Sequence, residues 1–267
     1  MRARYYNPKN GRFTQEDPIR DGYNFYTYCV NNPVRYIDST GLWFKSISEE
    51  MDTYKRLRET GMLKAIFSSF DDFKATYGFM VQAFADAKGI NVNFLYAFLS
   101  IETRHTGSGF FPDGRLFIQF EPDEFRKRTG YSLPNDLVLD PYDADSVYAV
   151  FEWAKKMDEY AAYMSISMGV GQIMGFNYAD AGYDSAKEMY DDFCTGYIAQ
   201  LYGFFNYIIN YDEGSILSSL QNGNFEAAVT SYNGTPTYND NLKTFCRIAG
   251  VEVPQWYKEY ADKKYGD

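Results

Sequence analysis

Residues 94–110, FLYAFLSIETRHTGSGF, decide how this chain is interpreted, because an apolar helical pattern there ends on a carboxylate. If Asn93–Arg104 is a helix, the residues three, four and seven positions before Glu102 share its face. These residues are Leu99, Phe98 and Leu95. An ionised carboxylate on such a stripe is costly without a partner, so its pKa usually rises, as a general acid near neutral pH requires. The alternative is a glutamate at a fraying helix end.

Two further blocks follow at wide spacing, GVGQIMGFN at 169–177 and TSYNGTPTY at 230–238. An E-[ST] at a helix end, then G-x-x-Q-I-M, then Y-N-G resembles the lysozyme and soluble lytic transglycosylase superfamily. The longer blocks IETRHTGSGFFPDGRLFIQFEPDEF, SISMGVGQIMGFNYADAGY and SYNG are similar to the phage-type N-acetylmuramidases of peptidoglycan-degrading endolysins. The resemblance covers Asp72 to Ala249.

This resemblance implies a lysozyme-like helical domain. Together with the element pattern and the turn-rich N-terminus, it predicts a mainly α fold with a small β element, preceded by a short turn-rich β tail. It places Glu102 at the family's catalytic glutamate and Glu121 at the acidic residue of its strand motif. The residues implied to hold the glycan are Gln172, Tyr232, Asn233 and Gly171. The family usually has E-S-G-G-S-G-F, whereas Thr103, Arg104, His105 and Thr106 make the loop two residues longer here.

Glycoside hydrolysis also needs a second group, and Glu121 is a suitable carboxylate for it. The alternating pattern of Arg115–Glu121, RLFIQFE, predicts a short strand after the turn formed by Pro112, Asp113 and Gly114. Glu121 then lies at the end of the strand, close to Asp123 and Glu124. The alternative is a solvated acidic turn that opens the helix EPDEFRKR.

Composition excludes several rival chemistries. The single histidine, His105, rules out a two-histidine zinc site, and a Ser-His or Cys-His pair would have to use it. Cys194 and Cys246 have no recognisable nucleophile motif. With Cys29 they are expected to be free thiols, or Cys194 pairs with Cys246 in an oxidising compartment. No phosphate-binding glycine motif occurs, so nucleotide binding has no support in the sequence. We therefore expect no metal and no cofactor.

Charge and hydropathy exclude further partners. The net charge of −10 disfavours nucleic acid and anionic membranes, because phosphate binding depends on Lys and Arg. No run of 18 apolar residues occurs and nothing in the polar N-terminus resembles a signal peptide, so neither membrane insertion nor a signal peptide is expected.

Residues 1–42 resemble the end of the conserved core of Rhs and YD-repeat polymorphic toxins. The shared motifs are R-Y-Y-x-P-x-x-G-R-F, D-P-I, Y-x-Y-x-x-N-N-P-V and D-x-x-G-L. The resemblance implies self-cleavage after Leu42 assisted by Asp17 and Asp38, although Ser39 replaces the proline of the family's D-P-x-G-L. The alternative is a turn-rich β appendage without activity.

The sequence predicts an Rhs segment at 1–42, a helical linker at 43–71 and a lysozyme-like domain at 72–267. Amphipathic patterns, N-caps and glycine stops place the helices. They are expected at 46–61, 72–88, 93–103, 143–163, 185–210, 216–221, 224–231 and 239–249, with an amphipathic stretch at 62–73.

Together these features predict a peptidoglycan hydrolase that cleaves the MurNAc-GlcNAc β-1,4 bond and acts as the toxin domain of an Rhs-type antibacterial effector. Its expected partners are peptidoglycan glycan strands and a cognate immunity protein. It would be secreted or delivered to the target-cell wall or periplasm. The alternatives are a lytic transglycosylase giving 1,6-anhydro products, a non-catalytic cell-wall-binding module, and a chitinase-like specificity.

Overall fold

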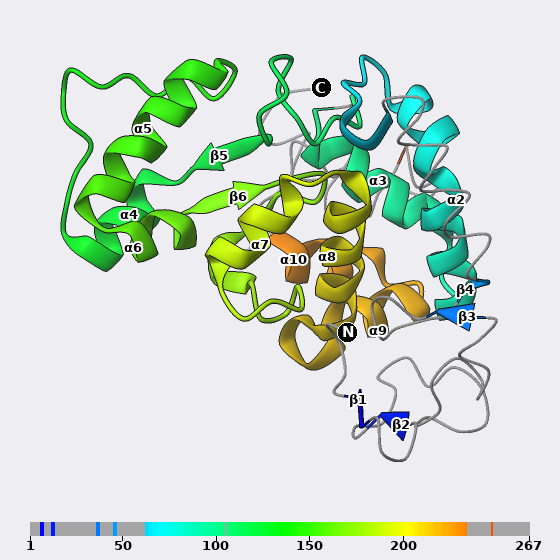
Figure 1. Cartoon of the computed structure of the whole chain (residues 1–267). Coiled ribbons are helices and arrows are strands. Elements are labelled where there is room, and N and C mark those ends of the chain that lie inside the picture. The colour runs from blue at the N-terminus through cyan, green and yellow to red at the C-terminus, as the bar shows by residue number, and fades with distance from the viewer. Residues whose placement is uncertain are drawn as a thin grey trace, which may run out of the picture. The chain divides into compact units, whose positions relative to one another are not determined.

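The structure is a computed structural model (Figure 1). The structure describes residues 62–104 and 106–233, four short strands nearer the N-terminus, and Arg247. The described residues form two compact units. The sheet unit contains those up to Ile66 and Gly109–Tyr207, and the helical unit contains those of Phe67–Ser108 and from Ile208 onward. Helices dominate both, which confirms the mainly α class.

The helical unit is built on two consecutive helices with clear ends. Its elements are α2 (Phe70–Lys88), α3 (Val92–Glu102), the last turn of α8, η4 (Tyr211–Gly214), α9 (Ser215–Gln221) and α10 (Phe225–Asn233). Ser69 caps α2 by accepting a hydrogen bond from the Asp72 N–H at 3.2 Å, and Gly89 ends it with a φ of 65°. Asn91 caps α3 in the same way, accepting from the Asn93 N–H at 3.0 Å. The helices predicted at 72–88 and 93–103 are confirmed to within two residues.

Aromatic rings join α10 to α3 within the helical unit. Phe225 stacks on Phe94 with 4.8 Å between ring centroids, and lies 6.0 Å from the ring of Phe98. Each such pair adds to the apolar area that the helices bury. Gln221, at the end of α9, donates a 2.8 Å hydrogen bond to the Lys88 carbonyl at the end of α2. These contacts fix α9 against α2 and α10 against α3.

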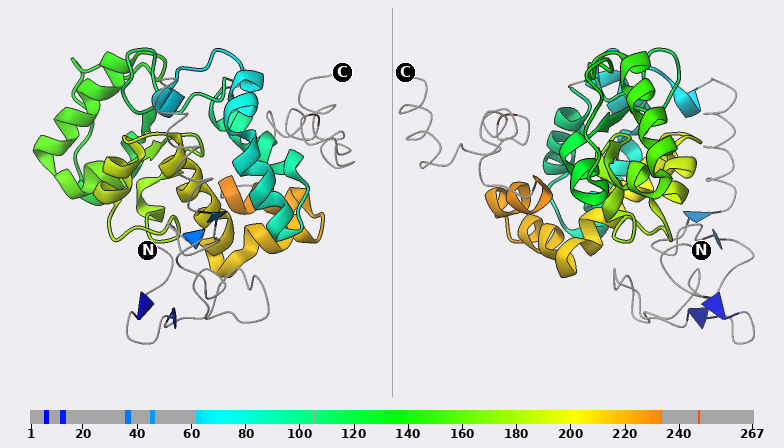
Figure 2. Two further views of the ribbon diagram at one scale, coloured as in Figure 1. Left: turned by 45° about the vertical axis from the view of Figure 1, so that its right-hand side comes forward. Right: turned by 90° about the vertical axis from the view of Figure 1, so that its left-hand side faces the viewer.

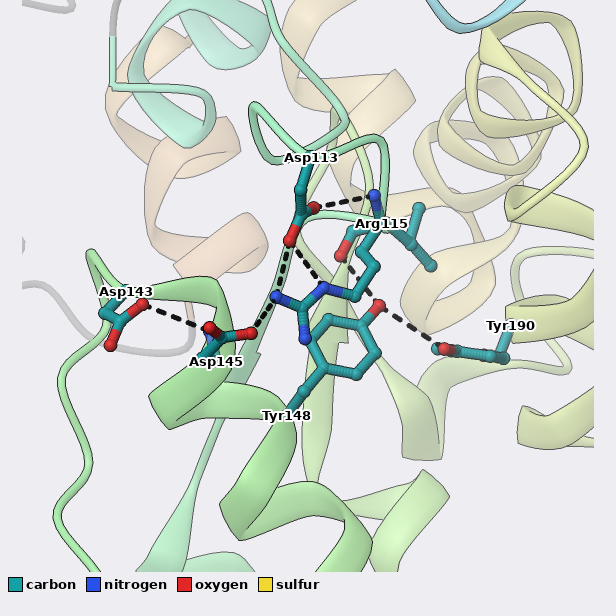
Figure 3. Close-up of polar contacts among 7 residues, drawn as sticks. Asp113, Arg115, Asp143, Asp145, Tyr148 and Tyr190 are labelled. Carbon is teal, nitrogen blue, oxygen red and sulfur yellow. Dashed lines mark hydrogen bonds and ion pairs between the residues drawn. The ribbon is translucent and has the colours of Figure 1, made fainter.

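The sheet unit contains three short antiparallel strands in the order β5-β6-β7. Its elements are η2 (Met62–Lys64), β5 (Ile118–Phe120), α4 (Pro122–Thr129), α5 (Ala144–Met157), α6 (Glu159–Met164), β6 (Ile166–Met168), β7 (Ile173–Met174), η3 (Gly175–Asn177), α7 (Ala186–Phe193) and most of α8 (Tyr197–Asn210). Helices α4, α5 and α6, green in Figure 2, pack as a group, and α5 also contacts β5.

The register of this sheet separates an apolar face from a polar one. Ile118 pairs with Met168, which pairs with Ile173, and all three are buried. Gln119 pairs with Ser167 on the opposite face. Because side chains alternate along a strand, the polar residues of β5 and β6 lie together. The strand predicted at 115–121 is confirmed in its second half, Ile118–Phe120, whereas β6 and β7 were not predicted.

Two long helices predicted from the sequence are wrong, because each is two helices. The stretch 143–163 breaks at Asp158, whose extended backbone ends α5 while its side chain accepts a 2.9 Å hydrogen bond from the Ala161 N–H and starts α6. The stretch 185–210 breaks before Gly196, which has a φ of 149° and lies against the Leu63 carbonyl. The helices predicted at 216–221 and 224–231 are confirmed as α9 and α10.

The predicted helical linker is also wrong in its described part. Lys45–Ser46 is strand β4, Met62–Lys64 is a single 3-10 turn, and 65–69 is not helical. The other N-terminal strands are β1 (Tyr6–Asn7), which pairs antiparallel with β2 (Arg12–Phe13), and β3 (Tyr36–Ile37), which pairs with β4. The helix predicted at 46–61 and nearly all of that at 239–249 lie outside the described residues, as do the boundaries at 42 and 43.

None of the helices in the described ranges is long and apolar enough to cross a membrane.

Candidate active site

Glu102 is the last residue of α3, and its carboxyl group is shielded from solvent. Although the residue as a whole is half-buried, its Oε1 is buried and has no hydrogen-bond partner among the described residues. Burial raises the pKa of Glu102 from 4.5 to about 8. Its position at the carbonyl end of a helix acts in the same direction, since the negative end of the helix dipole disfavours a carboxylate. Glu102 therefore holds its proton at neutral pH, as a general acid must.

The face of α3 that carries Glu102 is the one predicted from the sequence. The side chains one and two turns earlier, Leu95, Phe98 and Leu99, are all fully buried. These apolar neighbours offer the carboxyl group no charge partner, which explains why burial dominates its pKa. The alternative of a fraying helix end does not fit this packing.

The longer loop after Glu102 is held by hydrogen bonds from its threonines. The Thr103 hydroxyl donates to the Leu99 carbonyl at 2.6 Å and accepts from the Gly107 N–H at 2.8 Å. The Thr106 hydroxyl donates to the Thr103 carbonyl at 2.7 Å. Gly107 has a φ of 76°, and a Cβ there would collide with Phe73, so the loop closes tightly on α2.

Tyr232 lies in the same unit as Glu102, near the end of α10. Its ring packs on Phe98 with 4.6 Å between centroids, and Phe98 lies one helical turn before Glu102. The helical unit thus places Tyr232 against the helix that carries the acid. Asn233 is the last residue of α10, and its side chain lies outside the described residues.

Glu121 belongs to the sheet unit, where it follows β5 and begins α4. Its N–H donates a 2.8 Å hydrogen bond to the Ser165 carbonyl, which extends the pairing of β5 with β6. Although the residue is exposed, partial burial of its carboxyl group raises its pKa, and the nearby charges of Glu124 and Asp123 raise it further. Of the three carboxylates predicted to lie close together, Asp123 and Glu124 therefore act on Glu121.

Gln172 is buried in the turn between β6 and β7, and its amide group is fully engaged by the protein. Its Nε2 donates to the carbonyls of Gly169 at 2.9 Å and Phe117 at 3.3 Å. Its Oε1 accepts from Gln119 Nε2 and from the Ser167 hydroxyl, both at 2.9 Å. All the hydrogen-bonding groups of the Gln172 side chain are therefore engaged by residues of the sheet unit.

Sequence reasoning missed Gln200, which fixes the glycine segment before Gln172. Gln200 lies in α8 and is fully buried. Its Oε1 accepts from the Val170 N–H at 3.0 Å, and its Nε2 donates to the Phe193 carbonyl at 3.1 Å. Gly169 has a φ of 70°, and a Cβ there would lie 3.1 Å from Gln200 Oε1. The glycine at 169 is therefore needed for internal packing. Gly171 is buried in the same turn.

Other predicted site residues lie outside the described residues, namely His105, Asp17, Asp38, Leu42, Cys29 and Cys246. In the described part of the chain, Cys194 is a free thiol. No three His, Cys, Asp or Glu side chains gather there in a way that could hold a metal ion.

The helical fold, the small antiparallel sheet and a protonated glutamate at a helix end define a lysozyme-like glycoside hydrolase. A family model described as N-acetylmuramidase matches residues 91–245, and the chain belongs to this family of peptidoglycan hydrolases. Among solved structures, the crystal structure of Burkholderia AP3 phage endolysin is similar, with a TM-score of 0.52 and 23% sequence identity. That match covers 68% of this chain and 70% of the endolysin chain, and it confirms the lysozyme-like fold. No curated protein matches the chain.

Proposed function

We propose that this enzyme cleaves the MurNAc-GlcNAc β-1,4 glycosidic bond of peptidoglycan, with Glu102 as the general acid. The observation that carries the proposal is the buried, unpartnered carboxyl oxygen at the end of α3. Such a group is protonated at neutral pH, because its pKa is raised to about 8. It can therefore protonate the leaving oxygen of a glycosidic bond.

Glu121 is proposed as the second carboxylate. Partial burial of its carboxyl group and the nearby Glu124 and Asp123 raise its pKa, while the residue as a whole stays exposed to solvent. In the ionised state it would position water or stabilise the positive charge that develops on the sugar ring. Gln172, Tyr232, Asn233 and Gly171 are proposed to form the glycan site. Gln172 would contribute by ordering the sheet unit, because its amide already bonds to Gly169, Phe117, Gln119 and Ser167.

The test is digestion of purified sacculi by wild-type protein and Glu102→Gln. The variant keeps the shape of the side chain and removes its dissociable proton. Loss of general acid catalysis should lower the rate at least about a hundredfold. Glu226→Gln is the matched control, because Glu226 is an exposed carboxylate of α10 in the same unit. A folded Glu102→Gln protein that digests sacculi at the wild-type rate would refute the role of Glu102.

A lytic transglycosylase is the second candidate, favoured by one observation. Glu102 has a strongly raised pKa, whereas Glu121 is exposed, and a transglycosylase uses one glutamate as both acid and base. The same digests decide between the two reactions by mass spectrometry. Hydrolysis adds the mass of water at each cut, whereas transglycosylation leaves a 1,6-anhydro end.

The proposed biological role is that of the toxin domain of an Rhs-type antibacterial effector, delivered to the target-cell wall or periplasm and countered by an immunity protein. The motifs in residues 1–42 support this role. Self-cleavage after Leu42, assisted by Asp17 and Asp38, belongs to the same proposal. N-terminal sequencing of the purified protein tests it, since cleavage would leave a chain that begins at Trp43. An intact N-terminus after prolonged incubation would contradict self-cleavage.

A further inference from the structure

Only one orientation of the Gln172 amide satisfies its neighbours. Its Nε2 lies 2.9 Å from the Gly169 carbonyl and 3.3 Å from the Phe117 carbonyl. Carbonyl oxygens only accept hydrogen bonds, so the NH₂ group must face them. The Oε1 of Gln172 must then face Gln119 and Ser167.

This orientation determines that of Gln119 in turn. Gln119 donates from Nε2 to Gln172 Oε1 at 2.9 Å, and the reverse orientation would place two carbonyl oxygens against each other. The Oε1 of Gln119 is left as a hydrogen-bond acceptor that no other described residue uses. Its side chain is only half-buried, so a ligand can reach it.

Gln119 also lies on the same side of the sheet as Glu121. The two residues are two positions apart on an extended backbone, and the hydrogen bond from the Glu121 N–H to the Ser165 carbonyl continues the ladder. Ile118 and Phe120 point to the buried side. A group bound along the polar side of β5 would therefore meet both Gln119 and Glu121.

We propose that Gln119 is a substrate-contacting residue and that Gln172 is the positioning residue behind it. Gln119 Oε1 accepts a hydrogen bond from an N–H or O–H group of the N-acetylated glycan, and Gln172 holds the Gln119 amide in the required orientation. This inference rests on the proposed function and reassigns the contact with the glycan from Gln172 to Gln119.

The backbone at Gln172 supports a positioning role. Its φ is 43°, in the left-handed region that glycine adopts readily and other residues adopt at a cost. The residue at this position is a glutamine, although glycine would fit the backbone better. Its amide network supplies the reason, because it ties the turn to β5 and β6 through Gln119 and Ser167.

The first experiment compares Gln119→Leu with wild type on soluble, uncrosslinked peptidoglycan strands. Losing one hydrogen bond to the substrate should lower kcat/KM about three- to tenfold, chiefly through KM. The melting temperature should change little, because the side chain is half-buried and Gln172 keeps Ser167 as a donor. Gln82→Leu is the matched control, since Gln82 is exposed on α2 and also loses one side-chain hydrogen bond, to Asp86. It should leave kcat/KM unchanged.

The second experiment tests whether Gln172 acts through Gln119. Gln172→Gly relieves the backbone, and Gln172→Met keeps the side-chain volume, so at least one should fold. Each is combined with Gln119→Leu. If Gln172 only orients Gln119, the double variants should have the kcat/KM of Gln119→Leu within about twofold, because the contact is already lost.

The results separate the inference from the proposed function. If wild type digests the strands and Gln119→Leu matches it in KM and kcat, the inference is overturned while the function stands. Fully multiplicative losses in the double variants would overturn the positioning role of Gln172. If wild type releases no product from the strands, the proposed function itself fails.

Discussion

Replacing Glu102 by glutamine should make the protein more stable at alkaline pH. The folded state raises the pKa of Glu102 from 4.5 to about 8, so between these values the folded protein holds a proton that the unfolded chain has lost. The contribution of Glu102 to stability is therefore complete below pH 4.5 and is lost as the pH rises through about 8. Glutamine carries no dissociable proton and avoids this loss.

The size of this gain in stability follows from the pKa shift of Glu102. One pKa unit is worth about 1.4 kcal/mol, so the rise from 4.5 to about 8 corresponds to about 5 kcal/mol. Because Glu102 as a whole is only half-buried, water and local relaxation reduce this free energy. We expect about half of it to appear as a difference in stability. For a protein of this size, 1 kcal/mol shifts the melting temperature by about 2 to 4 °C. The variant should therefore melt roughly 5 to 10 °C above wild type at pH 9 and close to it at pH 4.5.

The assay is calorimetric or fluorescence melting of both proteins between pH 4.5 and pH 9, with activity measured on the same samples. Glu226→Gln is the control, and its melting curve should run parallel to that of wild type. Wild-type activity should fall above about pH 8, because Glu102 then loses the proton that it must donate. A difference in melting temperature between Glu102→Gln and wild type that stays constant with pH would refute the buried-acid reasoning.

Two further predictions concern packing and the N-terminal segment. Gly175→Ala should lower the free energy of unfolding by about 3 kcal/mol, because a Cβ there would collide with the Tyr163 carbonyl. Gly114→Ala should lower it by only about 1 kcal/mol, because the new Cβ meets no atom and only the φ of 86° is unfavourable. Urea unfolding measures both, and equal costs would contradict the collision. A chain beginning at Trp43 should fold and digest peptidoglycan within a few-fold of the full-length rate, because strands as short as β1 and β2 have little stability of their own. An insoluble or strongly destabilised product would place the boundary elsewhere.

Glu102, the proposed catalytic acid, could be singled out from the sequence because its signal is local. The helical period, the apolar stripe and the position of Glu102 at its end are all contained within about ten residues. The C-terminal end of α2 was equally clear, because Gly89 is an ordinary helix stop, whereas the cap at Ser69 starts the helix two residues before the predicted Asp72. The structure places Glu102 and Gly89 where the sequence indicates them.

The breaks at Asp158 and Gly196 were missed although their signals were present. Asp158 is followed by an acidic residue in the manner of a helix start, and Gly196 by a new apolar run. The helical spacing of apolar residues continues on both sides of each break, and it favoured a single long helix over these local signals.

The polar network of the sheet unit could not be predicted from sequence patterns. Gln119 and Gln172 are 53 positions apart, and Gln200 meets Val170 across 30 positions. Such pairs depend on the register of β5 with β6 and on the packing of α8. A motif can mark Gln172 as important, but only the register shows that its amide is turned inward.

The order of the two units along the chain has a consequence for dividing this enzyme. The polypeptide leaves the sheet unit after Ile66, returns at Gly109 and leaves again after Tyr207. A single cut anywhere between Phe67 and Tyr207 therefore distributes the helical unit, the sheet unit or both over two fragments. Neither fragment alone would hold every helix that surrounds Glu102 as well as the complete β5-β6-β7 sheet. Two inactive halves that regain activity when mixed would be the natural form of a split reporter made from this fold.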